Sequence, residues 1–163
     1  MKQSNKVSPS NYSFEDYFAA VNISDTTKSK LEQADILVLP HKYAANEYYF
    51  ADESINFMKF CRLNDAKHNT DILSDDNNFE VRALHSIDIW MPIIWVSTEL
   101  ILPIALDLVT RYINDKIRGR EKEKATVKMS MRVGSGDEIK EFNYDGDAKT
   151  FSETFGKIDV SEW

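Results

Sequence analysis

The chain has 163 residues and a formal charge of −7, from 20 basic and 27 acidic side chains. This length is enough for one domain with its own hydrophobic core, and the acidic balance argues against general binding to nucleic acid or anionic lipid. The single cysteine, Cys61, excludes an intrachain disulfide and fits a reducing compartment. Its place beside Phe57 and Phe60 indicates a buried small hydrophobe rather than a nucleophile.

The chain is expected to begin with a flexible tail over residues 1–12, followed by a single domain over residues 13–163. The first residues, Met1–Pro9, are polar and lack the apolar region of a secretory signal, so we expect a cytoplasmic protein. A capping box at Ser13–Asp16 predicts a short helix through Val21, and residues 26–33 are compatible with a second one.

A buried strand is predicted at Ile36–Leu39, where four apolar residues are stopped by Pro40. An aromatic loop over residues 41–50 follows, and its rings make it a candidate interface. Tyrosine buries a ring and keeps a hydroxyl for bonding, which suits an interface and also a loop packed on its own domain. The candidate interface residues of this loop are Tyr43, Tyr48, Tyr49 and Phe50.

A helix capped by Asp52 or Ser54 is predicted through Leu63, then a turn and a short strand at Thr70–Ser74. The acids and amides of Ser74–Asn78 resemble a calcium loop, but no glycine permits its sharp turn and no glutamate closes it. The histidines His41, His68 and His85 lack the spacing of metal ligands. We therefore predict no metal and no cofactor.

The segment Asp88–Ile113 is the most apolar part of the chain, with Glu99 as the only charge between Ile89 and Leu106. We predict a long helix here, over about residues 88–117, bent at Pro92 and Pro103. The two prolines are eleven residues apart, close to three helical turns, which returns Asp88 and Glu99 to one face. These acids form a possible polar site; the alternative is that they face solvent.

Membrane insertion is the competing interpretation of residues 89–106, because a span needs about 18 to 20 apolar residues. Glu99 near the middle and a polar stripe along one side favour a core helix covered by protein. The basic residues of Lys116–Lys124 suit the carboxyl end of a helix. Trp90 and Trp95 are further candidate interface residues.

The C-terminal part predicts a hairpin and a helix. Thr126–Val133 alternates apolar and polar residues, Gly134–Asp137 turns the chain, and Glu138–Tyr144 returns. Asp147 caps a short helix through Ile158, and Trp163 remains for docking or for a partner. The fold class is therefore α+β: a small mixed or antiparallel sheet packed on the long proline-bent helix, with additional short helices.

This C-terminal layout, a long apolar helix with a basic end, the hairpin of residues 125–144 and the Phe-bearing helix Asp147–Ile158, resembles the effector-associated constant components of bacterial conflict and antiphage systems. The resemblance implies an accessory role in a multi-protein assembly and carries no catalytic residues.

Three hypotheses follow. The first is a non-enzymatic interaction subunit of a bacterial intracellular assembly, which binds a protein partner or a second copy of itself through the aromatic loop, Trp90, Trp95 or Trp163. The second is a membrane-associated effector that inserts residues 89–106. The third is an enzyme or small-ligand binder that uses Asp35, Glu47 and His85.

Overall fold

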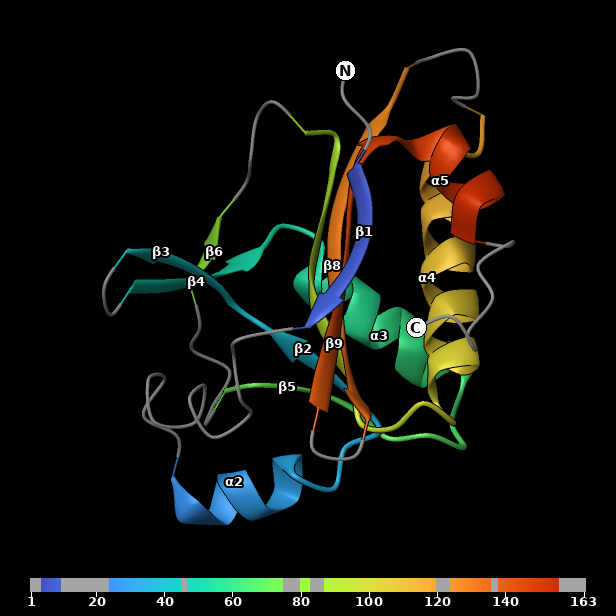
Figure 1. Ribbon diagram of the computed structural model, residues 1–163. Helices are drawn as coiled ribbons and strands as arrows, with labels where there is room; N and C mark the ends of the chain where they lie inside the picture. The colour runs from blue at the N-terminus through green and yellow to red at the C-terminus, as the bar shows by residue number, and fades with distance from the viewer. Residues whose placement is uncertain are drawn as a thin grey trace.

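The structure, a computed structural model, describes residues 4–9, 24–44, 47–74, 80–82, 87–119, 124–135 and 138–155. Its elements are shown in Figure 1 and run in chain order as β1 (Ser4–Pro9), α2 (Asp25–Leu31), β2 (Ile36–Leu39), β3 (His41–Ala44), β4 (Glu47–Ala51), α3 (Ser54–Asn64), β5 (Thr70–Ile72), β6 (Val81–Arg82), β7 (Ile89–Val96), α4 (Leu102–Ile117), β8 (Thr126–Ser135), β9 (Glu138–Asp147) and α5 (Ala148–Phe155). The predicted α+β class is confirmed.

The described strands form two sheets. The main sheet is mixed and has the order β1-β9-β8-β7-β2-β5, in which β7–β8 and β2–β5 are parallel pairs and the other neighbours are antiparallel. The smaller sheet has the order β3-β4-β6. Figure 1 shows α3, α4 and α5 on one side of the main sheet, while the smaller sheet projects from the other side.

The hydrophobic core lies between the main sheet and these three helices. Alternate residues of β8 point into it because successive side chains of a strand face opposite sides. The core includes Val127, Met129, Met131 and Val133 from β8, Phe142 and Tyr144 from β9, Phe57 and Cys61 from α3, Leu108, Val109 and Tyr112 from α4, and Phe151 from α5. A second, smaller cluster on the opposite face contains Leu31, Ala34, Leu37, Leu39, Leu73 and Ile93.

The prediction of one long proline-bent helix over residues 88–117 is wrong. Ile89–Val96 is strand β7, and the helix α4 covers only Leu102–Ile117, 16 residues. Pro92 falls where the β7–β8 register shifts, between Trp90 and Ile93, and a bulge tolerates a residue without an N–H. Pro103 occupies the first turn of α4, where the missing N–H costs no helical bond.

β7 lies in the interior of the main sheet, between β8 and β2, and side chains on both of its faces are buried. Ile89, Ile94 and Val96 belong to the main core, whereas Ile93 belongs to the second cluster. A strand buried on both sides is an almost continuous apolar run, which removes the period that distinguishes strand from helix. The segment 89–106 is thus divided between β7, a turn and the start of α4. Within the described ranges, no helix has the length and apolarity that crossing a membrane would require.

Several other predicted elements are confirmed. β2, α3, β5, the β8–β9 hairpin and α5 lie where the sequence predicts them. In the segment predicted as an aromatic loop, His41–Ala44 and Glu47–Ala51 form the strands β3 and β4. Ser4–Pro9, predicted as part of a flexible tail, form edge strand β1 against β9. The predicted helix at residues 13–21 lies outside the described residues.

Gly134, predicted as part of a turn, is a residue of β8. A Cβ at this position would lie 2.8 Å from the carbonyl oxygen of Ser97. The strand therefore needs glycine where it passes the end of β7.

Candidate functional site

Asp88 and Glu99, the predicted polar pair, are separated by the full length of β7, about 25 Å of extended chain. The Asp88 carboxylate accepts a bond of 2.9 Å from the Thr126 backbone N–H, which fixes the start of β8 beside β7. Glu99 forms an ion pair of 3.4 Å with Lys140. The two acids form no common site, because the helix that would have aligned them does not exist.

The predicted aromatic interface residues separate into core and surface. Phe50 is 4% exposed and belongs to the main core. Tyr48 and Trp95 are partly buried and pack on the second cluster. The Arg82 guanidinium lies 4.2 Å from the centre of the Tyr49 ring. Tyr43 belongs to β3, but its side chain and Trp163 lie outside what the structure describes.

Trp90 belongs to a group of partly buried side chains on one face of the main sheet, which we call the aromatic–basic face. Its members are His41, Trp90, Trp95, Lys128 and Arg132. β7 and β8 are parallel neighbours, and their register places Trp90 beside Lys128 and Trp95 beside Arg132. Residues in register on adjacent strands share a face of the sheet. These side chains therefore lie opposite the face that α3, α4 and α5 cover.

His41 joins this face from the start of β3. Its ring lies 4.9 Å from that of Trp90, centre to centre, and its Nε2 lies 3.4 Å from the Met91 carbonyl oxygen. Burial is the main cause that lowers the His41 pKa from 6.5 to about 4, and the positive charges of Lys128 and Arg132 act in the same direction. His41 is therefore neutral near pH 7.

The hydrogen-bonding groups of the face are unevenly satisfied. Arg132 is 5% exposed, and its Nε lies 3.6 Å from Glu141 Oε1. The Ser130 hydroxyl donates to Asn143 Oδ1 on β9. The indole nitrogen of Trp90 is shielded from solvent and has no hydrogen-bond acceptor within the described ranges. Lys128 has no ion pair among the described residues. Among the described residues, the Trp90 indole N–H thus has no acceptor and Lys128 has no ion pair, and these two residues are paired in the β7–β8 register.

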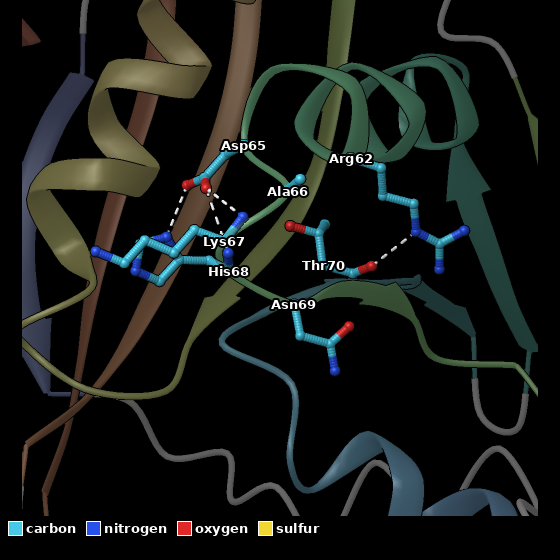
Figure 2. A pocket seen from close by; sticks show the side chains of 7 residues that line it. All are labelled: Arg62, Asp65, Ala66, Lys67, His68, Asn69 and Thr70. Carbon is cyan, nitrogen blue, oxygen red and sulfur yellow. Dashed lines mark hydrogen bonds and ion pairs between the residues drawn. The ribbon is translucent and has the colours of Figure 1, made fainter.

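A second candidate is the loop between α3 and β5, shown in Figure 2. It surrounds a depression of about 370 Å³ lined by Arg62, Asp65, Ala66, Lys67, His68, Asn69 and Thr70. Asp65 accepts bonds from the backbone N–H groups of Lys67 and His68, at 3.1 and 3.3 Å, and from His68 Nδ1 at 2.8 Å. Figure 2 shows the Asn69 side chain pointing away from the Asp65–His68 pair.

The bonds of this loop hold the loop itself. Desolvation opposes ionisation of Asp65, but the hydrogen bonds from His68 outweigh it and lower the carboxyl pKa. Arg62 donates from Nε to the Thr70 carbonyl oxygen, 2.9 Å away, and from its terminal nitrogen to Asp71. The carboxylate and the guanidinium are thus already engaged, and the depression is better explained as an ordered connection than as a ligand site.

A third polar cluster links α3 to α4. Glu53 Oε1 lies 2.7 Å from both the Tyr112 hydroxyl and Lys116 Nζ, and the Glu53 side chain is 9% exposed. Burial, with the bond to Glu53, raises the Tyr112 pKa. Lys116 lies at the carboxyl end of α4, as predicted, and its ion pair with Glu53 ties this end to the start of α3. We assign this cluster to stability.

The remaining predicted candidates are placed as follows. Cys61 is fully buried, as predicted, and burial raises its pKa to about 12. Asp35 accepts the Asn69 backbone N–H at 2.9 Å. The side chain of Glu47 and all of His85 lie outside the described residues, so their convergence with Asp35 stays a prediction. In the part of the chain that is described, no three His, Cys, Asp or Glu side chains gather closely enough to hold a metal ion.

Comparisons with protein-family models, curated proteins and solved structures found no match to this chain. The function is therefore argued from geometry. The sequence pattern did not indicate His41, Lys128 or Arg132 as site residues, although the alternation of Thr126–Val133 places Lys128 and Arg132 on one side of a strand. The pattern did not show that β7, with Trp90, is the neighbouring strand of β8, because residues 89–96 were predicted to be helical.

Proposed function

We propose that this protein is a non-enzymatic interaction subunit that binds a partner protein through the aromatic–basic face. The observation that carries the proposal is the pairing of Trp90 with Lys128 in the β7–β8 register. Among the described residues, the indole N–H has no acceptor and the Lys128 ammonium has no ion pair, and the His41 ring lies 4.9 Å from that of Trp90. Aromatic residues and arginine are enriched at the energetic centres of protein interfaces. A shielded donor without an acceptor costs about 1–3 kcal/mol, which a partner can recover.

The setting of this subunit is part of the same proposal. The layout that resembles effector-associated constant components keeps its hairpin, β8–β9, and its Phe-bearing helix, α5, but loses its long helix. This resemblance motivates a bacterial, cytoplasmic defence assembly. The reactive side chains support a binding role over a chemical one, since Cys61 is buried with a pKa raised to about 12. A thiol in that state is a poor nucleophile at neutral pH.

Co-expression with the products of neighbouring genes tests the proposal. We expect a complex of fixed stoichiometry by native mass spectrometry, weakened by Trp90→Phe, which replaces the indole with a smaller aromatic ring and removes the N–H. Loss of one such hydrogen bond should raise the dissociation constant about fivefold to tenfold. Lys149→Ala, an exposed change on α5, is the matched control. A lone monomer in every co-expression would sink the proposal.

A further inference from the structure

Strand β1 forms one edge of the main sheet, and its neighbour among the described strands is β9 alone. The two strands are antiparallel over six register pairs, from Ser4 beside Asp145 to Pro9 beside Lys140. β8, on the other side of β9, pairs with it over ten residues. Because β1 is both the first described strand of the chain and an edge strand, it can leave the sheet without breaking any other strand pair.

The sequence of β1 gives this pairing little apolar area. Val7 is the register partner of Phe142, which is 2% exposed, whereas Asn5 is the register partner of the buried Tyr144. Serine, lysine and proline make up the rest of the strand. On its other side Phe142 is paired with the buried Met131 of β8. The β1–β9 pairing therefore depends on backbone hydrogen bonds, and we expect it to open at a lower free energy than the core strands.

We infer that the β9 edge is a strand-acceptor site, and that the Ser4–Pro9 segment of a second copy of this chain is the partner that occupies it. An uncovered sheet edge presents unpaired N–H and C=O groups, with which an extended segment can form an additional strand. Ser4–Pro9 already matches this edge in a defined register, so a second copy offers a matching strand by identity. Reciprocal exchange would join two chains in a closed, two-fold symmetric dimer.

The inference goes beyond the proposed function, because it concerns the edge of β9 and not the aromatic–basic face. Exchange reproduces the same strand pairing between chains that β1 makes within one chain. The closed form benefits from the tether, which gives β1 an effective concentration of the order of 1 mM at the β9 edge. The exchanged form should therefore increase with total protein concentration.

Disulfide trapping between two variants of the full chain tests this inference. One chain carries Ser4→Cys and the other, isotopically labelled, carries Asp145→Cys at the register partner. Mixed in a glutathione redox buffer from about 0.01 mM to about 1 mM, they should form increasing amounts of heterodimer linked at these positions, identified by peptide mass spectrometry. Ser4→Cys mixed with Lys149→Cys, on exposed α5, is the control. Cys61 is buried and common to all these chains, and circular dichroism checks the fold of each.

Two adjacent substitutions in the Ser4→Cys chain distinguish strand exchange from other association. Val7→Asp places a carboxylate in register with Phe142 and should reduce the heterodimer about tenfold or more. Lys6→Gln changes the next residue, which falls on the opposite face of the sheet, and should alter the yield by less than about twofold. Trp90→Phe should leave the heterodimer unchanged, so that a failure of exchange and a failure of the proposed function are distinguishable.

Three results would overturn the inference. The first is a yield of the Ser4–Asp145 heterodimer no higher than that of the Lys149→Cys control at the highest concentration. The second is an equal yield with and without Val7→Asp, which would assign the association to another surface. The third concerns a single chain carrying both Ser4→Cys and Asp145→Cys, which should form its disulfide internally at low concentration. If it does not, β1 does not pair with β9 and exchange loses its basis.

Discussion

The two faces of the main sheet differ in the polarity of the side chains that β7, β8 and β9 place on them. On the face that α3, α4 and α5 cover, β8 and β9 present apolar pairs such as Met131 beside Phe142, both buried. One residue further along, the opposite face presents Arg132 beside Glu141. Alternation makes this separation possible, because each strand contributes independently to both sides of the sheet. On β8 and β9 the apolar burial thus lies on the helix-covered face, whereas the opposite face carries the charged side chains.

Neighbouring residues of β9 give the sharpest contrast between the faces. Phe142→Ala removes a ring that is 2% exposed and should lower the free energy of unfolding by about 3–5 kcal/mol. Asn143→Ala removes a bond to Ser130 on the opposite face and should cost about 1 kcal/mol. Urea unfolding followed by fluorescence measures both. Equal losses would show that the two faces carry comparable shares of the stability.

Acid should act on the polar face through His41, whose pKa burial lowers to about 4. As the pH falls below about 6.5, His41 becomes protonated in the unfolded chain but stays neutral in the folded one. The free energy of unfolding therefore decreases until about pH 4, where folded His41 is protonated as well. The loss from this group is at most about 3 kcal/mol. His41→Phe should remove that part of the acid dependence in urea unfolding at several pH values, whereas His68→Gln should retain it. Parallel acid profiles for the wild-type chain and His41→Phe would contradict this account.

The helix-covered side contains one buried acid, Glu53, and its removal tests whether that side tolerates a broken polar cluster. Glu53→Ala leaves the Tyr112 hydroxyl without its acceptor, while Lys116, whose side chain is 38% exposed, can regain water. We expect a loss of about 2 kcal/mol in thermal or urea unfolding. Asp115→Ala breaks the exposed pair with Arg118 and should change stability by less than about 0.5 kcal/mol. Matching effects would mean that burial does not strengthen the Glu53 cluster.

The smallest effect is expected at the loop between α3 and β5, outside both faces. Asp65→Ala removes the acceptor of the Lys67 and His68 amides, so their hydrogen exchange should quicken while global stability falls by about 0.5–1 kcal/mol. Asn69→Ala is the control, because the Asn69 side chain points away from Asp65 and His68. Unchanged exchange at both amides would show that the loop is ordered by other contacts.

Much of the fold could be predicted from local pattern. The alternation in Thr126–Val133 predicts β8 and its two faces, the apolar run Ile36–Leu39 predicts β2, and the cap before α5 is present in Asp147, which accepts the Thr150 backbone N–H at 2.9 Å. Each of these features depends on residues close together in the chain. Local backbone geometry and one-sided burial are sufficient to specify them.

The candidate site was less accessible, because it needs strands that are distant in sequence. Its halves, Trp90 and Lys128, are 38 positions apart and meet only through the parallel pairing of β7 with β8. The recurrence of Pro92 and Pro103 indicated a bent helix, since an eleven-residue spacing is also helical.

The sequence by itself determined that Ile89–Val96 is apolar enough to be buried, and that Thr126–Val133 is a strand with one polar side. Only the tertiary structure decided that Ile89–Val96 is a strand too, because its covering comes from two directions and erases the local period. The bulge at Pro92 then allows a proline within the sheet. Long-range pairing, which no local pattern encodes, brought the indole and the ammonium to the same face.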